Sequence, residues 1–179
     1  MTSHINLSSS RSYTSVHSFV DLTAEVPGCI SGTLLFQGCN LECPFCFNKE
    51  LMVEYESPFS RYQSILKNIL EHPYNGIAFG GGEPLLYQKE LVGIIMNDIP
   101  EVWHKAIYTN FTESFMPGLF DLIDYWFVSL KPKDYYAVAQ WRRLTFNLGL
   151  YGQSPKVKFV EVEGHGLAEQ LKYVDPKEL

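Results

Sequence analysis

Short apolar, β-favouring runs alternate with segments of helical periodicity along this 179-residue chain, and this alternation constrains its fold more than any other feature. The runs that predict strands lie at residues 30–36, 76–79, 104–109 and 124–130. The segments that predict helices between them lie at about 57–72 and 87–97, with a weaker one interrupted at 117–118. Strands connected through helices run parallel, and because these strands are apolar throughout, we expect helices on both faces of the sheet.

The chain is too short for a complete barrel of this kind. A further helix is predicted near 134–143, and further strands at 145–150 and 157–162. A complete eight-stranded α/β barrel usually needs about 250 residues. We therefore predict a single-domain α/β partial barrel over residues 16–179, preceded by a loosely ordered, Ser- and Thr-rich lead-in at 1–15.

Charge and hydropathy exclude several classes of function. The 14 Lys and Arg residues against 20 Asp and Glu residues leave a net charge of -6, which disfavours binding to a nucleic-acid backbone. The apolar runs are shorter than the roughly 20 residues of a spanning helix, so no membrane insertion is expected. Since the N-terminus lacks the pattern of a secretory signal, we expect a cytoplasmic protein.

Three of the four cysteines follow the first predicted strand directly. Cys39, Cys43 and Cys46 have the spacing Cys-x3-Cys-x2-Cys, and cysteines clustered in a cytosolic protein are typical of metal sites. Three thiolates can bind three irons of a [4Fe-4S] cluster and leave the fourth iron open to a ligand. The alternatives are a structural zinc loop, with Cys29 or a histidine as fourth ligand, or cysteines of the core. Cys29 begins a predicted strand, where a small buried residue is expected.

A glycine-rich turn, Gly80 to Pro84 with the sequence GGGEP, follows the second predicted strand. The turn lacks the pattern of a phosphate-binding loop. Glycines let a backbone approach a ligand closely, and the carboxylate of Glu83 suits an ammonium group. Taken alone, the turn would be an ordinary strand-to-helix connection. Because ligands bind at the carboxyl ends of parallel strands, we expect this turn and the cysteine loop to lie at one edge of the sheet.

The cysteine loop after a first strand, Phe45 directly before the last cysteine and the Gly-Gly-Glu turn after the second strand together resemble the radical S-adenosylmethionine superfamily. The resemblance implies a partial (β/α)6-type barrel in which the open iron chelates S-adenosylmethionine. It also implies roles for individual residues. The cluster ligands would be Cys39, Cys43 and Cys46; Phe45 would lie beside the adenine; and the methionyl amino group would be held by Gly81, Gly82 and Glu83.

Further cofactor contacts are expected where the third and fourth strands end. Thr109 and Asn110 close one strand, and Lys131 follows the next, where it could meet the cofactor's carboxylate. Many glycyl-radical-enzyme activases have aspartates where this chain has Tyr108 and Ser129, which argues against a monovalent-cation site built from those aspartates. His165 is interpreted as a histidine of a surface loop.

Residues 26–136 resemble the activating proteins of anaerobic ribonucleoside-triphosphate reductase and the related pyruvate formate-lyase activases, including Asn48 after the last cysteine. The departure is Phe47, where tyrosine or histidine is more common. The resemblance implies that the chain cleaves S-adenosylmethionine reductively and generates a glycyl radical on a partner enzyme, with anaerobic ribonucleotide reductase the expected partner. Electrons would come from a flavodoxin- or ferredoxin-type reductant.

Two other functions remain open. One is a radical enzyme that acts on a small molecule, as a 7-carboxy-7-deazaguanine synthase does, although such enzymes typically have aspartate near the position of Asn48. The other is a non-catalytic interaction domain that a bound metal stabilises.

Overall fold

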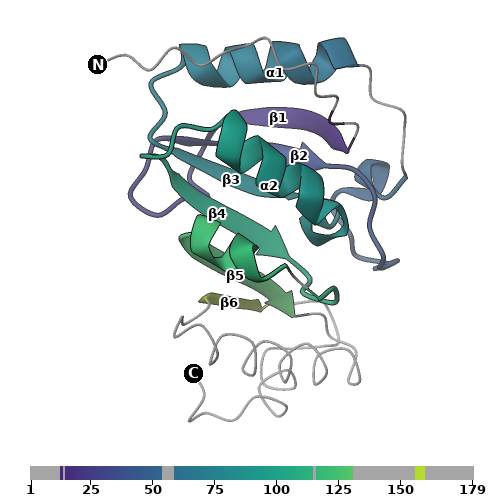
Figure 1. Cartoon of the computed structure of the whole chain (residues 1–179). Coiled ribbons are helices and arrows are strands. Elements are labelled where there is room, and N and C mark those ends of the chain that lie inside the picture. The colour runs from purple at the N-terminus through teal and green to yellow at the C-terminus, as the bar shows by residue number, and fades with distance from the viewer. Residues whose placement is uncertain (1–12, 14, 54–58, 115, 131–155, 160–179) are drawn as a thin grey trace.

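A single six-stranded sheet organises the chain in the computed structural model, which describes residues 13, 15–53, 59–114, 116–130 and 156–159 (Figure 1). The strands follow one another across the sheet in chain order. They are β1 (Val16–Thr23), β2 (Ser31–Phe36), β3 (Gly76–Gly81), β4 (His104–Thr109), β5 (Tyr125–Leu130) and β6 (Lys156–Phe159). β1 pairs antiparallel with β2, and the remaining neighbours pair in parallel.

Two α-helices and three short 3-10 helices connect these strands. The α-helices are α1 (Phe59–Glu71) and α2 (Gln88–Asn97). The 3-10 helices are η1 (Lys49–Leu51), η2 (Pro84–Tyr87) and η3 (Pro117–Leu122). The weaker helix predicted around residues 117–118 is a 3-10 helix. No helix in the described part of the chain is both long and apolar enough to cross a membrane.

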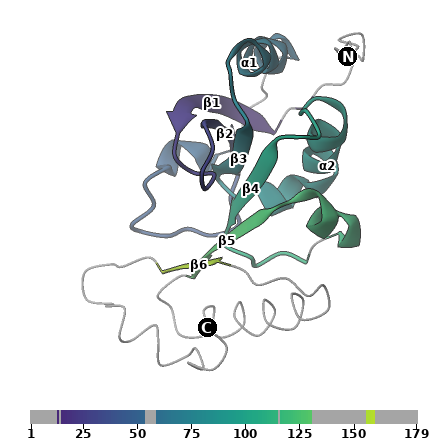
Figure 2. The same cartoon turned by 90° about the vertical axis from the view of Figure 1, so that its left-hand side faces the viewer.

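Sequential strand order confirms the predicted α/β partial barrel. When each parallel strand lies beside its predecessor and the crossovers are right-handed, successive helices fall on the same face and the twisted sheet curls. Figures 1 and 2 show α1 beside the β1 end of the sheet and α2 over its middle. The expectation of helices on both faces is wrong for the described elements, because α1, α2 and η3 all pack on one face.

The main core lies between that face and the helices. Alternate strand residues such as Leu34, Phe79 and Ile107 are buried there against the apolar positions of α1 and α2. In α1 these positions are Tyr62, Leu66 and Ile69, which recur at helical spacing. Each buried side chain of this size stabilises the fold by about 1.5–3 kcal/mol. This packing fixes the strands whose ends carry the candidate site.

The opposite face of the sheet has small side chains at its centre. Ala78 and Ala106 occupy its centre together with Val26, in a minor cluster of buried residues. Farther along the strands, the rings of Tyr108 and Phe127 stack with centroids 4.6 Å apart. Because these residues alternate with those that face the helices, the same strands build the core on one side and leave room for a ligand on the other.

β1 was not predicted from the sequence, and it brings the end of the predicted lead-in into the core. Tyr13 packs edge-on against Tyr62 with ring centroids 4.9 Å apart, and the Ser15 hydroxyl donates a hydrogen bond to the Glu90 carboxylate. Both Tyr13 and Ser15 are buried. The domain boundary between residues 15 and 16 stays a prediction.

Several predictions concern residues outside the described part of the chain. They are the helix at 134–143, the strand at 145–150, the helix start at 57–58, Lys131 and His165. β6 coincides with part of the strand predicted at 157–162.

Candidate functional site

A cavity of about 500 Å³ opens where the parallel strands β2 to β5 end. One wall is the cysteine loop that follows β2, and the other is formed by the ends of β3, β4 and β5. The lining residues of the loop are Cys39, Leu41, Cys43, Phe45, Cys46, Phe47, Asn48 and Met52; those on or near the strands are Glu25, Thr33, Leu35, Gly80, Gly81, Gly82, Tyr108, Thr109, Asn110 and Ser129. The cysteine loop and the glycine turn thus meet at one edge of the sheet, as strand polarity predicts.

Backbone hydrogen bonds fold the cysteine loop back on itself. Gly38 leaves β2 with a φ of 73°, and its N–H donates to the carbonyl of Leu51 in η1 at 2.6 Å. Within the loop the N–H of Cys46 donates to the carbonyl of Cys43 at 3.1 Å. The three cysteines of the loop line the cavity. All four cysteines of the chain are free thiols, so no disulfide closes the loop.

The thiol of Cys39 lies in an unfavourable place for a negative charge. Burial raises its pKa, a hydrogen bond from the Leu41 backbone opposes this effect, and the charges of Glu83, Cys43 and Cys46 raise the pKa further. A cation bound among these thiols would stabilise the thiolate that burial and the neighbouring charges disfavour.

The donor set fits an iron–sulfur cluster. Cys39, Cys43 and Cys46 place three thiols around one cavity. A four-iron cluster binds each thiolate at a different iron, and soft thiolates are the donors that iron–sulfur centres prefer.

Close backbone contact explains two glycines of the GGGEP turn. Gly81 has a φ of 100°, which favours glycine, and the N–H of Gly82 donates to the carbonyl of Phe36 at 2.8 Å. A Cβ atom on Gly82 would lie only 1.9 Å from the carbonyl oxygen of Gly38. The turn therefore packs directly on the start of the cysteine loop, and its glycines hold the two cavity walls together.

The carboxylate of Glu83 is fully buried behind this turn, with 0% exposure. Its Oε1 accepts hydrogen bonds from the Leu85 N–H at 2.9 Å and the Thr109 hydroxyl at 2.7 Å. Its Oε2 accepts from the Asn110 N–H at 2.7 Å. Glu83 thus caps η2 and ties the turn after β3 to the end of β4. The predicted contact of Glu83 with an amino group stays a prediction.

Asn110 connects this buried carboxylate to the cysteine loop. Its side-chain N–H groups donate to the Asn40 side chain at 3.0 Å and to the Cys39 sulfur at 3.8 Å. Asn40 in turn donates to Thr112 at 2.7 Å and to Glu113 at 2.8 Å. Asn40, Thr112 and Glu113 were not singled out from the sequence, because isolated polar residues in two separate loops carry no spacing signal.

The two residues that argued against a monovalent-cation site, Tyr108 and Ser129, lie at this edge of the sheet. The ring of Tyr108 stacks on Phe127, and its hydroxyl donates a hydrogen bond to the carbonyl of Glu25 at 3.0 Å. Burial, followed by the contact with Glu25, raises the pKa of Tyr108, so the phenol stays neutral. Ser129 also lines the cavity. Neutral side chains therefore occupy both positions.

Aromatic side chains stand at the rim. Phe45, predicted to lie beside an adenine, lines the cavity together with its neighbour Phe47. The ring of Phe47 is 98% exposed, which is unusual for a large apolar side chain. Asn48 follows Phe47 in the chain and precedes η1. Its carbonyl accepts a hydrogen bond from the N–H of Leu51 at 3.0 Å.

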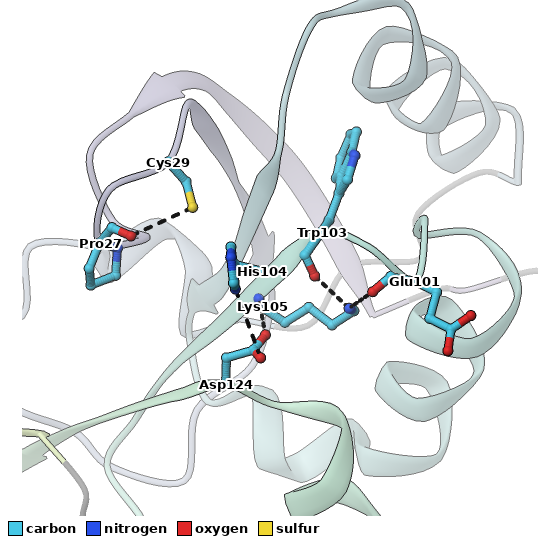
Figure 3. Close-up of polar contacts among 7 residues, drawn as sticks. All are labelled: Pro27, Cys29, Glu101, Trp103, His104, Lys105 and Asp124. Carbon is cyan, nitrogen blue, oxygen red and sulfur yellow. Dashed lines mark hydrogen bonds and ion pairs between the residues drawn. The ribbon is translucent and has the colours of Figure 1, made fainter.

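Cys29 lies at the other end of β2 from the cysteine loop. The six residues of that strand span about 20 Å at about 3.3 Å each, too far for Cys29 to share a metal ion with Cys39. Its thiol donates to the carbonyl of Pro27 at 3.6 Å (Figure 3). Cys29 is half-buried rather than a core residue as expected.

The surroundings of Cys29 belong to the amino-terminal end of the sheet. Figure 3 shows the buried ammonium of Lys105 held by the backbone carbonyls of Trp103 at 2.6 Å and Glu101 at 3.0 Å. Asp124 accepts the Lys105 N–H at 2.7 Å. These contacts fasten strand ends and contribute nothing to the cavity at the opposite edge.

The chain is similar to one protein family and to two known proteins. Residues 26–115 match the model of a 4Fe-4S single cluster domain, half of the chain. A protein of Methanocaldococcus jannaschii named as a glycyl-radical enzyme activating enzyme is 31% identical over 80 residues, which are 44% of this chain. That match spans 33% of the relative, so the chain corresponds to about a third of its length. The crystal structure of QueE from Escherichia coli is similar with a TM-score of 0.49 and 14% identity, over 82% of this chain and 84% of that one.

Proposed function

Because the chain belongs to the 4Fe-4S single cluster domain family, within the radical S-adenosylmethionine superfamily, we propose that it is a glycyl-radical-enzyme activase. In this proposal it cleaves S-adenosylmethionine reductively and generates a glycyl radical on a partner enzyme, anaerobic ribonucleotide reductase. The observation that carries the proposal is the cavity in which Cys39, Cys43 and Cys46 face the glycine turn across the carboxyl edge of the sheet.

In the proposed enzyme those three cysteines hold a [4Fe-4S] cluster, and S-adenosylmethionine occupies the cavity beside it. A reduced cluster held there would supply the electron for reductive cleavage of the S–C5′ bond of S-adenosylmethionine, and the cleaved cofactor would take a hydrogen atom from the partner's glycine. The backbone of Gly81 and Gly82 would face the methionyl group, and Phe45 the adenine.

The chain's own residues orient these groups and exclude water. The apolar side chains of Leu35, Leu41 and Met52 line the cavity between the loop and the strands. The buried Glu83 and its three hydrogen bonds hold the glycine turn in register with the end of β4. A ligand in such a site meets a preorganised wall, and water is kept from the reactive carbon by apolar contacts.

A protein partner is supported by the rim of the cavity. Covering the exposed side chain of Phe47 with another surface would gain about 1.5–3 kcal/mol of burial free energy. Aromatic side chains often dominate the binding energy of protein interfaces. The relative named as an activating enzyme supports the same class of substrate. We place the reaction in the cytoplasm, with a flavodoxin- or ferredoxin-type protein as reductant, because thiolate-bound clusters need reducing surroundings.

The proposal is tested by electron paramagnetic resonance. The chain is reconstituted anaerobically with iron and sulfide, reduced, and mixed with S-adenosylmethionine and anaerobic ribonucleotide reductase or another glycyl-radical enzyme. The expected result is a glycine-centred doublet that requires both the chain and S-adenosylmethionine. Cleavage of S-adenosylmethionine without a doublet on any glycyl-radical enzyme would contradict the activase assignment.

A small-molecule substrate is the second candidate, and the polar groups on the cavity floor favour it. Glu25, Thr33 and Ser129 line the cavity on the side away from the cysteine loop, where they could bind a compact polar substrate. Formation of 7-carboxy-7-deazaguanine or a related product, with no glycyl radical, would identify this function.

A further inference from the structure

The side chain of Asn110 lies where the end of β4 meets the cysteine loop, and it contacts Cys39 of the candidate cluster site. We infer that Asn110 is a positioning residue for the iron–sulfur cluster: its amide holds the cysteine loop and raises the cluster's reduction potential through a hydrogen bond to the Cys39 sulfur. The inference rests on the proposed ligation of a cluster by Cys39, and the predicted contact of Asn110 with the nucleotide cofactor stays a prediction.

Every hydrogen-bonding position of the Asn110 amide is used within the protein. An asparagine side chain has two donor N–H groups and an oxygen with two acceptor positions. The donors reach Asn40 at 3.0 Å and Cys39 at 3.8 Å. The oxygen accepts the N–H of Thr112 at 2.9 Å and its hydroxyl at 2.6 Å. No position is left for a nucleotide, so a cofactor contact would have to break one of these bonds.

The orientation of the amide follows from the same network. The backbone N–H of Thr112 can only donate, so the atom that faces it at 2.9 Å must be the amide oxygen. The amide nitrogen therefore faces the cysteine loop, and a flipped amide would place two donors against each other.

Asn110 is also rigidly supported from below. It is 5% exposed, and its backbone N–H donates to the buried Glu83 carboxylate at 2.7 Å. The preceding Thr109 is buried too and donates to the same carboxylate. A donor fixed in this way stays in place beside the sulfur, although the cysteine loop is more exposed. Residues that orient a metal ligand act in the same way.

A hydrogen bond to a cluster sulfur acts on the redox equilibrium. Reduction adds one negative charge to the cluster and its thiolates, so an N–H donor stabilises the reduced form more than the oxidised form. Removing the donor should therefore lower the reduction potential. Asn40 also holds the cysteine loop, but it donates to Thr112 and Glu113 rather than to a cysteine. A variant of Asn40 therefore shows the effect of loosening the loop without removing the hydrogen bond to the Cys39 sulfur.

The test measures the midpoint potential of the reconstituted protein without S-adenosylmethionine or partner. In Asn110→Ala the equilibrium constant for reduction should fall at least about threefold, so that the variant is about a quarter reduced where the unchanged protein is half reduced. Asn40→Ala should shift it less, and Asn97→Ala, which removes a side-chain hydrogen bond to the Gly93 carbonyl at the end of α2, should not shift it. A potential in Asn110→Ala equal to that of the unchanged protein, or a shift no larger than in Asn40→Ala, would overturn the inference.

A second measurement uses the unchanged protein and so does not depend on the variant's folding. With ¹⁵N in asparagine side chains only, the reduced cluster should show a weak ¹⁵N hyperfine coupling, and Asn40→Ala should retain it. A cluster that lacks this coupling refutes the contact. Neither experiment uses a glycyl-radical enzyme, so the inference can fail while the proposed function stands, and the reverse also holds.

Discussion

Replacing Glu83 by alanine should destabilise the protein before it affects chemistry. The side chain is fully buried and accepts hydrogen bonds from two backbone N–H groups and one hydroxyl, those of Leu85, Asn110 and Thr109. Two orphaned N–H groups cost about 1–3 kcal/mol each. Removing the carboxylate also removes its own desolvation cost, which offsets part of this loss. We expect a net loss of about 3 kcal/mol, or about 6–12 °C in Tm for a domain of this size.

Glu83→Gln should destabilise the protein less than Glu83→Ala, because it keeps one oxygen but turns an NH₂ group toward a backbone donor. It should lose about half as much stability as Glu83→Ala. The assay is thermal unfolding under argon of the cluster-loaded protein. Glu71→Ala is the matched control, since Glu71 forms only an exposed pair with Lys67 and should change stability by less than about 0.5 kcal/mol. If Glu83→Ala has the same Tm as the unchanged protein and loses only affinity for S-adenosylmethionine, the expected destabilisation from burial is refuted.

Two further variants test the walls and the rim of the cavity. Gly82→Ala should lose about 3 kcal/mol, because its Cβ would lie 1.9 Å from the Gly38 carbonyl oxygen, whereas the nearest atom to a Cβ on Gly80 is at 3.7 Å and Gly80→Ala should lose less than about 1 kcal/mol. Equal Tm values for the two glycine variants would disprove the close contact. Phe47→Ala should leave Tm unchanged, because its ring is 98% exposed, but should slow radical formation on a protein partner at least about tenfold. A rate equal to that of the unchanged protein would mean that the rim does not bind the partner.

Periodicity was sufficient to predict most of the elements because packing reinforces it. β2 and β4 begin within a residue of their predicted positions, and α1 contains the predicted apolar stripe of Tyr62, Leu66 and Ile69. β1 was missed because the preceding residues are polar and its pairing with β2 is antiparallel, which strand–helix alternation does not reveal. Among the described elements, helices on both faces were wrongly expected, because apolar strands do not show which of their faces borders a cavity.

The sequence likewise predicted one part of the candidate site and missed another. The spacing of the cysteines and the GGGEP turn pointed to one edge of the sheet, and the cavity joins them there. What sequence could not supply was the hydrogen bonding between loops distant in the chain. The links from Glu83 to Asn110 and from Asn110 to Asn40 depend on how strand ends are juxtaposed, and no local pattern records them.

Formation of 5′-deoxyadenosine from S-adenosylmethionine by the reduced, reconstituted protein tests the central claim most directly. We expect alanine at Cys39, Cys43 or Cys46 to abolish the product and the brown colour of the cluster, while Cys29→Ala, at the far end of β2, retains most of both. Loss of activity in Cys29→Ala equal to that in the other three, or no cleavage by the unchanged protein with a full cluster, would contradict it.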